Sequence, residues 1–160
     1  FVATLIPHTV EPDQPVVLHG MQFTPIRLLH GRLPILGFRI EPVRGAFDHA
    51  PQDSPFPLAY CTDVSAIPTE TFRKLRGLRT LVLDALRHRA HPTHFTVAEA
   101  VNAAGNIGAQ QTWFVHMTHD LLHAQTDADL PEGMRLAYDG LVLGQTTMPV
   151  VEPRAPVFEQ

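Results

Sequence analysis

Apolar runs of four to ten residues, separated by proline- and glycine-rich turns, divide the chain into short strand-like and helix-like segments. One short strand is predicted at residues 15–18. Two runs rich in β-forming residues, 22–29 and 35–40, lie on either side of a turn at 31–34 and predict a β-hairpin. Residues 41–57 contain four of the fifteen prolines, and we expect them to form an exposed loop.

Strand and helix patterns alternate in the next part of the chain. A short buried strand is predicted at 57–62, followed by a helix over 67–76 that begins near Pro68 and ends at Gly77. The continuous apolar run at 80–83 is typical of a central strand that is covered on both faces.

A capping box predicts the start of the next helix. Thr96 is the expected N-cap and Glu99 the residue that bonds back to it, after a loop at 88–93. The alanine-rich segment that follows is expected to stay helical until Gly105 or Gly108.

Four further segments complete the pattern. We expect a strand at 111–115 and a short helix over 121–127. Strands at 134–138 and 141–143 would flank the dipeptide Asp139-Gly140, which favours a two-residue hairpin turn.

This order of elements predicts an α/β fold with a mixed β-sheet and covering helices. The 160 residues suffice for one domain with a real core. We expect residues 1–143 to form that domain and residues 144–160, which show no period, to be a loose tail or to wrap a partner.

The charge balance and the single cysteine limit the classes of partner and the cellular compartment that we expect. Twelve Lys and Arg against sixteen Asp and Glu give a net charge of −4 without a basic block, which argues against a broad nucleic-acid surface. Cys61 has no partner for an intrachain disulfide, which favours a reducing, cytoplasmic setting. The apolar run at residues 1–6 is too short for a signal peptide or a membrane span.

Three strand-like runs end in a side chain that can bind metal: His30, Asp63 and His116. Strand ends that share an edge of a sheet bring such side chains together, and imidazole and carboxylate groups bind divalent cations. The alternatives are a strand-end His30 bonded to backbone and an Asp63 that caps the next turn.

Several other histidines are candidates. His94 lies just before a predicted helix N-terminus, where it could donate to a phosphate or protonate a leaving oxygen, and His91 competes for that role. His116 and His119 are three residues apart, and the strand-end position favours His116. The roles of His119 and His123 stay open.

Five motifs in order resemble those of the metallo-β-lactamase-fold hydrolases, most closely the branch of the cyclic phosphodiesterase of phosphonate breakdown, with the tRNA 3′-processing endonucleases more distant. They are LAYCTDVS (58–65), LVLDALR (81–87), HPTHFT (91–96), VHMTHD (115–120) and YDGL (138–141). The resemblance covers about residues 15–143. It implies that this chain is the C-terminal half of an αββα sandwich.

The resemblance also implies residue roles. His30 and His116 match metal ligands, and Asp63 matches the carboxylate that bridges two metal ions. His94 matches the histidine that contacts the scissile phosphate and can act as general acid, so His94 and Asp63 are the expected catalytic side chains.

The family begins with a half that carries His-x-His-x-Asp-His, a motif that this sequence lacks. We therefore expect a missing N-terminal half or a partner chain to supply it, with a homodimer as another way to cover the fold. The implied activity is hydrolysis of a small or cyclic phosphodiester by a hydroxide that two divalent ions activate, zinc or manganese before iron.

Two alternatives belong to other classes: a non-catalytic half-domain that completes a partner, and a hydrolase of thioesters or lactones with the same fold. The natural substrate, the metal and the oligomeric state are open at this point.

Overall fold

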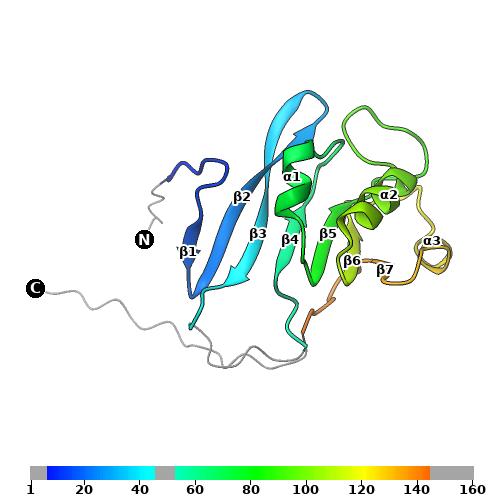
Figure 1. The fold of residues 1–160 in the computed structure, drawn as a ribbon. Coiled ribbons are helices and arrows are strands. Elements are labelled where there is room, and N and C mark those ends of the chain that lie inside the picture. The colour runs from blue at the N-terminus through cyan, green and yellow to red at the C-terminus, as the bar shows by residue number, and fades with distance from the viewer. Residues whose placement is uncertain (1–6, 46–52, 145–160) are drawn as a thin grey trace, which may run out of the picture.

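The computed structural model describes residues 7–45 and 53–144, which contain one seven-stranded sheet in the sequential order β1 to β7 (Figure 1). The strands are β1 (Val16–Leu18), β2 (Met21–His30), β3 (Leu33–Pro42), β4 (Leu58–Cys61), β5 (Thr80–Asp84), β6 (Gln111–Val115) and β7 (Met134–Leu136). The helices are α1 (Thr69–Lys74), α2 (Val97–Ile107) and α3 (His123–Ala128). The expected tail lies outside the described residues from position 145 onward.

The sheet is mixed, as the pattern predicted. Strands β1 to β4 pair antiparallel, and β4 to β7 pair parallel. Because β2 and β4 are both antiparallel to β3, they run in the same direction. The carboxyl ends of β2, β4, β5 and β6 therefore lie at one edge of the sheet, where α/β proteins place their sites.

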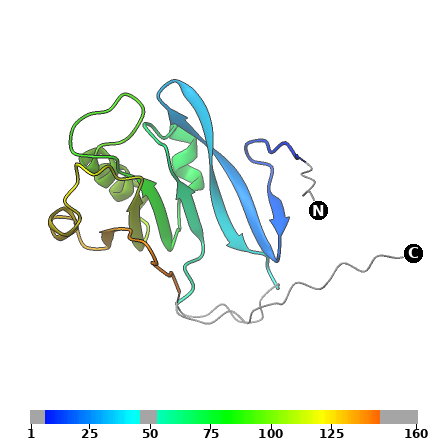
Figure 2. The same cartoon turned by 180° about the vertical axis from the view of Figure 1, so that it is seen from behind.

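Helices α1 and α2 cover the same face of the sheet (Figures 1 and 2). The parallel strands follow one another in one direction, and right-handed crossovers along one direction place successive helices on one side. The core lies beneath them. It includes the fully buried Leu81 and Leu83 of β5, Phe114 of β6 and Ala100 of α2.

No described helix covers the other face of the sheet (Figure 2), and a row of apolar residues crosses that face. Phe38, Tyr60, Val82 and Trp113 are successive register partners across β3 to β6. Tyr60 is 45% exposed, whereas its chain neighbours on the helix side are fully buried. Strand β5 is central and entirely buried, as expected, but within the described residues helices cover only one of its faces.

The predicted hairpin around Asp139 and Gly140 is wrong. Strand β7 ends at Leu136 and pairs parallel with β6 instead of with residues 141–143. Asp139 and Gly140 do form a tight turn, in which the Leu141 N–H donates to the Tyr138 carbonyl. The local turn signal was correct, but the partner of β7 lies elsewhere in the sequence.

The predicted start and end of α2 are confirmed, whereas the predicted turn between β2 and β3 differs from the structure. The capping box is present: Thr96 Oγ1 accepts from the Glu99 N–H, and Glu99 Oε2 accepts from the Thr96 N–H. Helix α2 ends at Gly108, the later of the two expected glycines. The turn between β2 and β3 is shorter than predicted, because Leu33 and Pro34 already belong to β3 and pair with β2.

Replacing Gly37 by alanine is expected to destabilise the fold. A Cβ atom there would lie 2.8 Å from the Tyr60 carbonyl oxygen and 2.6 Å from a Leu28 methyl group. Backbone cannot yield as a side-chain tip can, so we expect a loss of about 1–3 kcal/mol in urea unfolding. Gly105→Ala is the control: nothing lies within 4 Å of its added Cβ, and it should gain up to about 1 kcal/mol in helix propensity. Equal stabilities for the two variants would contradict the close packing at Gly37.

Candidate metal centre at the carboxyl edge of the sheet

Five polar side chains meet at the carboxyl edge of the sheet. His30 is the last residue of β2, Asp63 follows β4 by two residues, Asp84 ends β5, and His116 directly follows β6. His94 comes from the loop before α2. The sheet topology thus brings together all four residues that were predicted for the site, His30, Asp63, His94 and His116.

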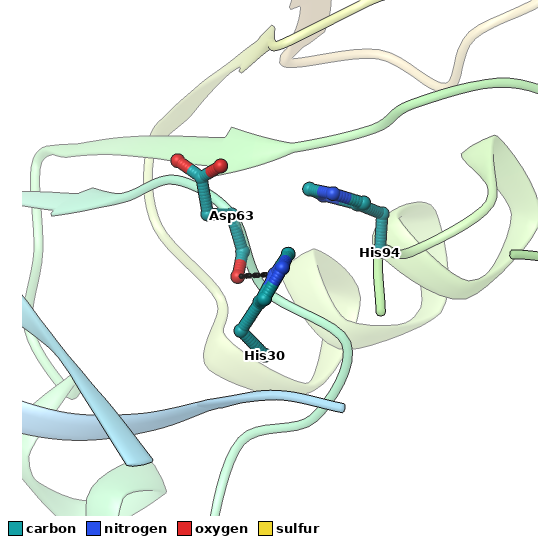
Figure 3. Close-up of side chains that lie close together, drawn as sticks. All are labelled: His30, Asp63 and His94. Carbon is teal, nitrogen blue, oxygen red and sulfur yellow. Dashed lines mark hydrogen bonds between the residues drawn. The ribbon is translucent and has the colours of Figure 1, made fainter. Parts of the chain in front are cut away.

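The cluster is tight enough to hold a cation. One ligand atom each from His30, Asp63 and His94 lie within 4.8 Å of one another (Figure 3). His116 joins them through Nε2, which lies 3.5 Å from Asp63 Oδ1. Asp63 is therefore close to more than one histidine, and its carboxylate is the shared acidic group.

The imidazole of His94 lies between two other rings. Its centroid is 4.6 Å from that of His30, edge-on, and 4.8 Å from that of His116, stacked. His30 Nδ1 lies 3.0 Å from the Asp63 carbonyl oxygen, which can only accept a hydrogen bond. Nδ1 of His30 is therefore the protonated nitrogen, and the lone pair of its neutral ring is on Nε2.

Two of these residues have left-handed backbone. Asp63 has φ 59° and His116 has φ 63°. This conformation is uncommon for residues other than glycine and costs roughly 1–3 kcal/mol where it is strained, less for Asp and His than for β-branched residues. Its occurrence after β4 and after β6, on either side of β5, is typical of a functional site, where the required side-chain direction outweighs local preference.

Asp84 has a larger part than its sequence suggested. Its side chain is fully buried at the carboxyl end of β5. Its Oδ2 atom accepts from the Val64 N–H at 2.8 Å and from His94 Nδ1 at 2.8 Å. The only signal in the sequence was an acidic residue at the end of a fully apolar strand.

Opposing effects act on the pKa of the Asp84 carboxyl group. Burial raises the pKa of the Asp84 carboxyl, while its bonds to His94 and to the Val64 N–H work in the opposite direction. Its second oxygen, Oδ1, is buried and has no hydrogen-bond partner among the described residues. A buried carboxylate that is half satisfied is stabilised by positive charge nearby, which a protonated histidine or a bound cation would supply.

The donor set fits a divalent cation. Imidazole nitrogens and carboxylate oxygens converge within ligand reach of one another, and this combination suits zinc, manganese or iron. His30, Asp63 and His116 stay the predicted ligands. The position of His94 is compatible with two roles, metal ligand or proton donor, because it lies among these groups and is also bonded to Asp84.

The remaining histidines surround this cluster or lie away from it. His91 is the nearest, with its ring 5.1 Å from that of His94. Burial, followed by the positive charges of Arg87, His94 and His30, lowers the pKa of His91. The side chain of His119 is 97% exposed, and His123 Nε2 donates to the Ala137 carbonyl oxygen outside the cluster.

Two further features do not belong to the site. Burial raises the pKa of the Cys61 thiol to about 12, so this side chain is a packed core group and not a nucleophile. A shallow cavity of about 350 Å³, lined by Arg79, Gln111 and Trp113 among others, lies at the amino ends of β5 and β6, at the edge opposite the cluster.

No helix among the described elements is both long and apolar enough to cross a membrane.

Comparison with known proteins agrees with the fold. The family model for the beta-lactamase superfamily domain matches residues 3–117. The structure of a diphosphatase from the PhnP family is similar, with 40% sequence identity and a TM-score of 0.72 over 84% of this chain. Zn²⁺-bound PqqB from Methylobacterium extorquens shares the fold, with 16% identity and a TM-score of 0.58 over 84% of this chain.

A curated relative, an octanoyltransferase from Porphyromonas gingivalis, is 33% identical over 134 residues. These residues are 82% of this chain but 24% of that protein. The chain likewise spans 46% of the diphosphatase and 50% of PqqB. It therefore corresponds to about half of each solved structure and to about a quarter of the curated relative.

Proposed function

The chain belongs to the beta-lactamase superfamily domain family, and on that premise we propose that it forms the C-terminal half of a metal-dependent phosphodiesterase acting on a small or cyclic phosphodiester. Its fold is that of the metallo-β-lactamase-like hydrolases. The observation that supports the proposal is the convergence of His30, Asp63, His94 and His116 at one edge of the sheet. The likeness to a diphosphatase at 40% identity favours a phosphate ester over other esters.

Each side chain has a proposed task. His30, Asp63 and His116 would hold divalent metal, and Asp63 would be the shared carboxylate because it lies close to more than one histidine. When bound, such ions supply an activated water nucleophile at neutral pH and neutralise phosphoryl charge. Zinc and manganese are the proposed metals, and iron suits the same donors.

His94 is the proposed acid. Asp84 engages its Nδ1, so its Nε2 atom is directed away from the buried carboxylate. A protonated His94 can donate the Nε2 proton to a phosphoryl oxygen or to the leaving alkoxide oxygen. The bond to Asp84 holds the ring in one orientation and so removes a rotational cost from that step.

We further propose that a second half completes the site, supplied by another segment of the same polypeptide or by a partner chain. Three or four protein ligands on one sheet edge are few for two metal ions. The uncovered sheet face, with Tyr60 45% exposed, offers the apolar surface on which that half would pack. Its proposed ligands are the histidines and the aspartate of a His-x-His-x-Asp-His motif, and a homodimer is the other cover to test.

Two alternative functions predict different results. A non-catalytic half-domain would have the same uncovered face but would complete a partner without binding substrate. A thioester or lactone hydrolase would use the same cluster on an acyl group, a possibility that the octanoyltransferase relative raises. That relative aligns over only 24% of its length, which gives its named activity little weight here.

The proposal is tested with the complete enzyme, meaning this chain together with the half that completes it. The protein is chelated, reloaded with zinc or manganese, and assayed on bis(p-nitrophenyl) phosphate, on a cyclic nucleotide and on an acyl thioester. We expect metal-dependent hydrolysis of phosphodiesters. Hydrolysis of the thioester alone, or no metal retained after reloading, would refute a phosphodiesterase.

A further inference from the structure

His91 lies beside the proposed acid without any task in the proposed function. Its ring centroid is 5.1 Å from that of His94, with the two planes inclined by 44°. Both belong to the loop between β5 and α2. The ring of His94 is in turn 4.6 Å from that of His30, so His91 lies next to the cluster.

The hydrogen bonds of His91 determine which nitrogen carries hydrogen. Its Nδ1 atom accepts from the Thr93 N–H at 3.4 Å and lies 3.2 Å from the Thr93 hydroxyl. A neutral ring that accepts at Nδ1 carries its hydrogen on Nε2, and a protonated ring carries one there as well. Nε2 of His91 is therefore a hydrogen-bond donor in either state, and the described residues provide no acceptor for it.

The loop that carries His91 is held in place from two sides. Arg87 donates to the carbonyl oxygens of Arg89 and Ala90, which closes the loop just before His91. On the other side, Thr93 packs against Gly31, where an added Cβ would lie 3.0 Å from the Thr93 methyl group. His91 is thus positioned before any substrate arrives, which lowers the entropic cost of using it.

The charges around this loop favour an anion. Arg87 lies on the same loop and is only loosely paired, with its Nη1 atom 3.9 Å from Asp120 Oδ2. His30 and His94 add two imidazoles on the inner side. The acidic groups that face this region are Asp84, which is engaged with His94 and Val64, Asp120, which is half exposed, and Asp63 of the cluster, whose charge a bound cation would neutralise.

We propose that His91 is a second substrate-binding residue, whose Nε2–H donates to a non-bridging phosphoryl oxygen beside the group that His94 serves. This inference rests on the proposed function, since it assigns the bound group as a phosphate. It extends that function by placing two histidine donors on one phosphoryl group, which selects tetrahedral oxyanions over the planar acyl group of a thioester.

The test is the binding of inorganic phosphate to the metal-loaded complete enzyme, measured by titration calorimetry. His91→Ala should weaken phosphate binding about ten-fold or more, as expected for a lost hydrogen bond to a charged group. His91→Gln keeps an N–H donor close to the position of Nε2 and should bind within about three-fold of wild type. His88→Ala, an exposed histidine of the same loop, is the matched control and should bind like wild type.

Metal content and circular dichroism accompany each variant, so that a folding defect is separated from lost contact. Unchanged phosphate affinity in His91→Ala, a glutamine variant as weak as the alanine variant, or no phosphate binding by wild type would each overturn the inference. Phosphate binding through His91 without any phosphodiester hydrolysis would refute the proposed function and leave the inference standing. Phosphodiester hydrolysis together with a phosphate affinity that does not depend on His91 would support the proposed function and refute the inference.

Discussion

Replacing Asp63 by asparagine is expected to abolish tight metal binding and to lower the turnover of the complete enzyme by about 10³-fold. Asp63 is the one carboxylate among the clustered ligand atoms, and His116 lies 3.5 Å from it. A neutral amide is a poor ligand where a bridging charge is needed, and metal ions contribute several kcal/mol to such reactions, about 10³-fold in rate. Elemental analysis after dialysis and the phosphodiesterase rate measure the two effects.

Asparagine is the informative replacement because the backbone of Asp63 has φ 59°. Asparagine tolerates this left-handed conformation, whereas alanine at the same position adds strain to the loss of the carboxylate. Asp129→Ala, at an exposed aspartate that caps the C-terminus of α3, is the control. An Asp63→Asn protein that keeps its full metal content would show that Asp63 is not a ligand.

The contrast with His94→Ala separates binding from proton transfer. If His94 serves the substrate, its removal should leave metal content intact while turnover falls. A ligand atom of His94 also lies within 4.8 Å of those of His30 and Asp63, so metal content distinguishes a ligand from an acid. Metal loss as large in His94→Ala as in Asp63→Asn would instead make His94 a ligand and would end its assignment as the acid.

Replacing Asp84 by asparagine is the change with the second largest expected effect, a fall in turnover of about 10²-fold with metal retained. Both of its hydrogen bonds use Oδ2, so an asparagine whose oxygen occupies that place keeps the bonds to Val64 and His94. What it removes is the negative charge behind the His94 ring. General acid catalysis contributes about 10²–10⁴-fold, and a neutral amide supports the protonated ring poorly.

Asp84→Ala separates charge from position. Alanine leaves the buried Val64 N–H without its acceptor, which costs about 1–3 kcal/mol, and frees the His94 ring. We therefore expect a further loss of activity together with a lower free energy of unfolding. Asp84→Asn and Asp84→Ala with equal activity, both close to wild type, would exclude Asp84 as a positioning residue.

The pH dependence of stability in the metal-free protein gives a readout of Asp84 that does not depend on turnover. Burial raises its pKa, so the folded state disfavours the ionised carboxyl relative to the unfolded state. The contribution of Asp84 to stability is therefore greatest below the ordinary aspartate pKa and falls as pH rises from that value to the raised one. Asp84→Asn should lack this decline in urea unfolding across the same window.

Much of the architecture follows from local patterns in the sequence. Thr96 and Glu99 specify the start of α2 because a capping box is satisfied within four residues. The apolar runs of β2, β3 and β6 were found because strand patterning is a property of consecutive residues. The hairpin at Asp139-Gly140 failed for the complementary reason: a turn dipeptide says nothing about which strand β7 will pair with.

The same division holds in the site. His30, Asp63 and His116 could be predicted because each ends an apolar run, and strands of one direction deliver their ends to one edge. The role of Asp84 could not, because its partners Val64 and His94 lie twenty and ten residues away. Its burial depends on how β4, β5 and the loop before α2 pack together.

The sequence by itself therefore determined the strands, the helix caps and the residues that can bind metal or transfer protons, since these depend on side-chain chemistry and on periodicity along the chain. The tertiary structure alone decided which carboxylate is buried behind which histidine, which nitrogen of His30 carries hydrogen, and which sheet face is left uncovered among the described residues. These properties depend on contacts between segments that are far apart in the sequence. Such contacts exist only once the strands have paired and the sheet has formed.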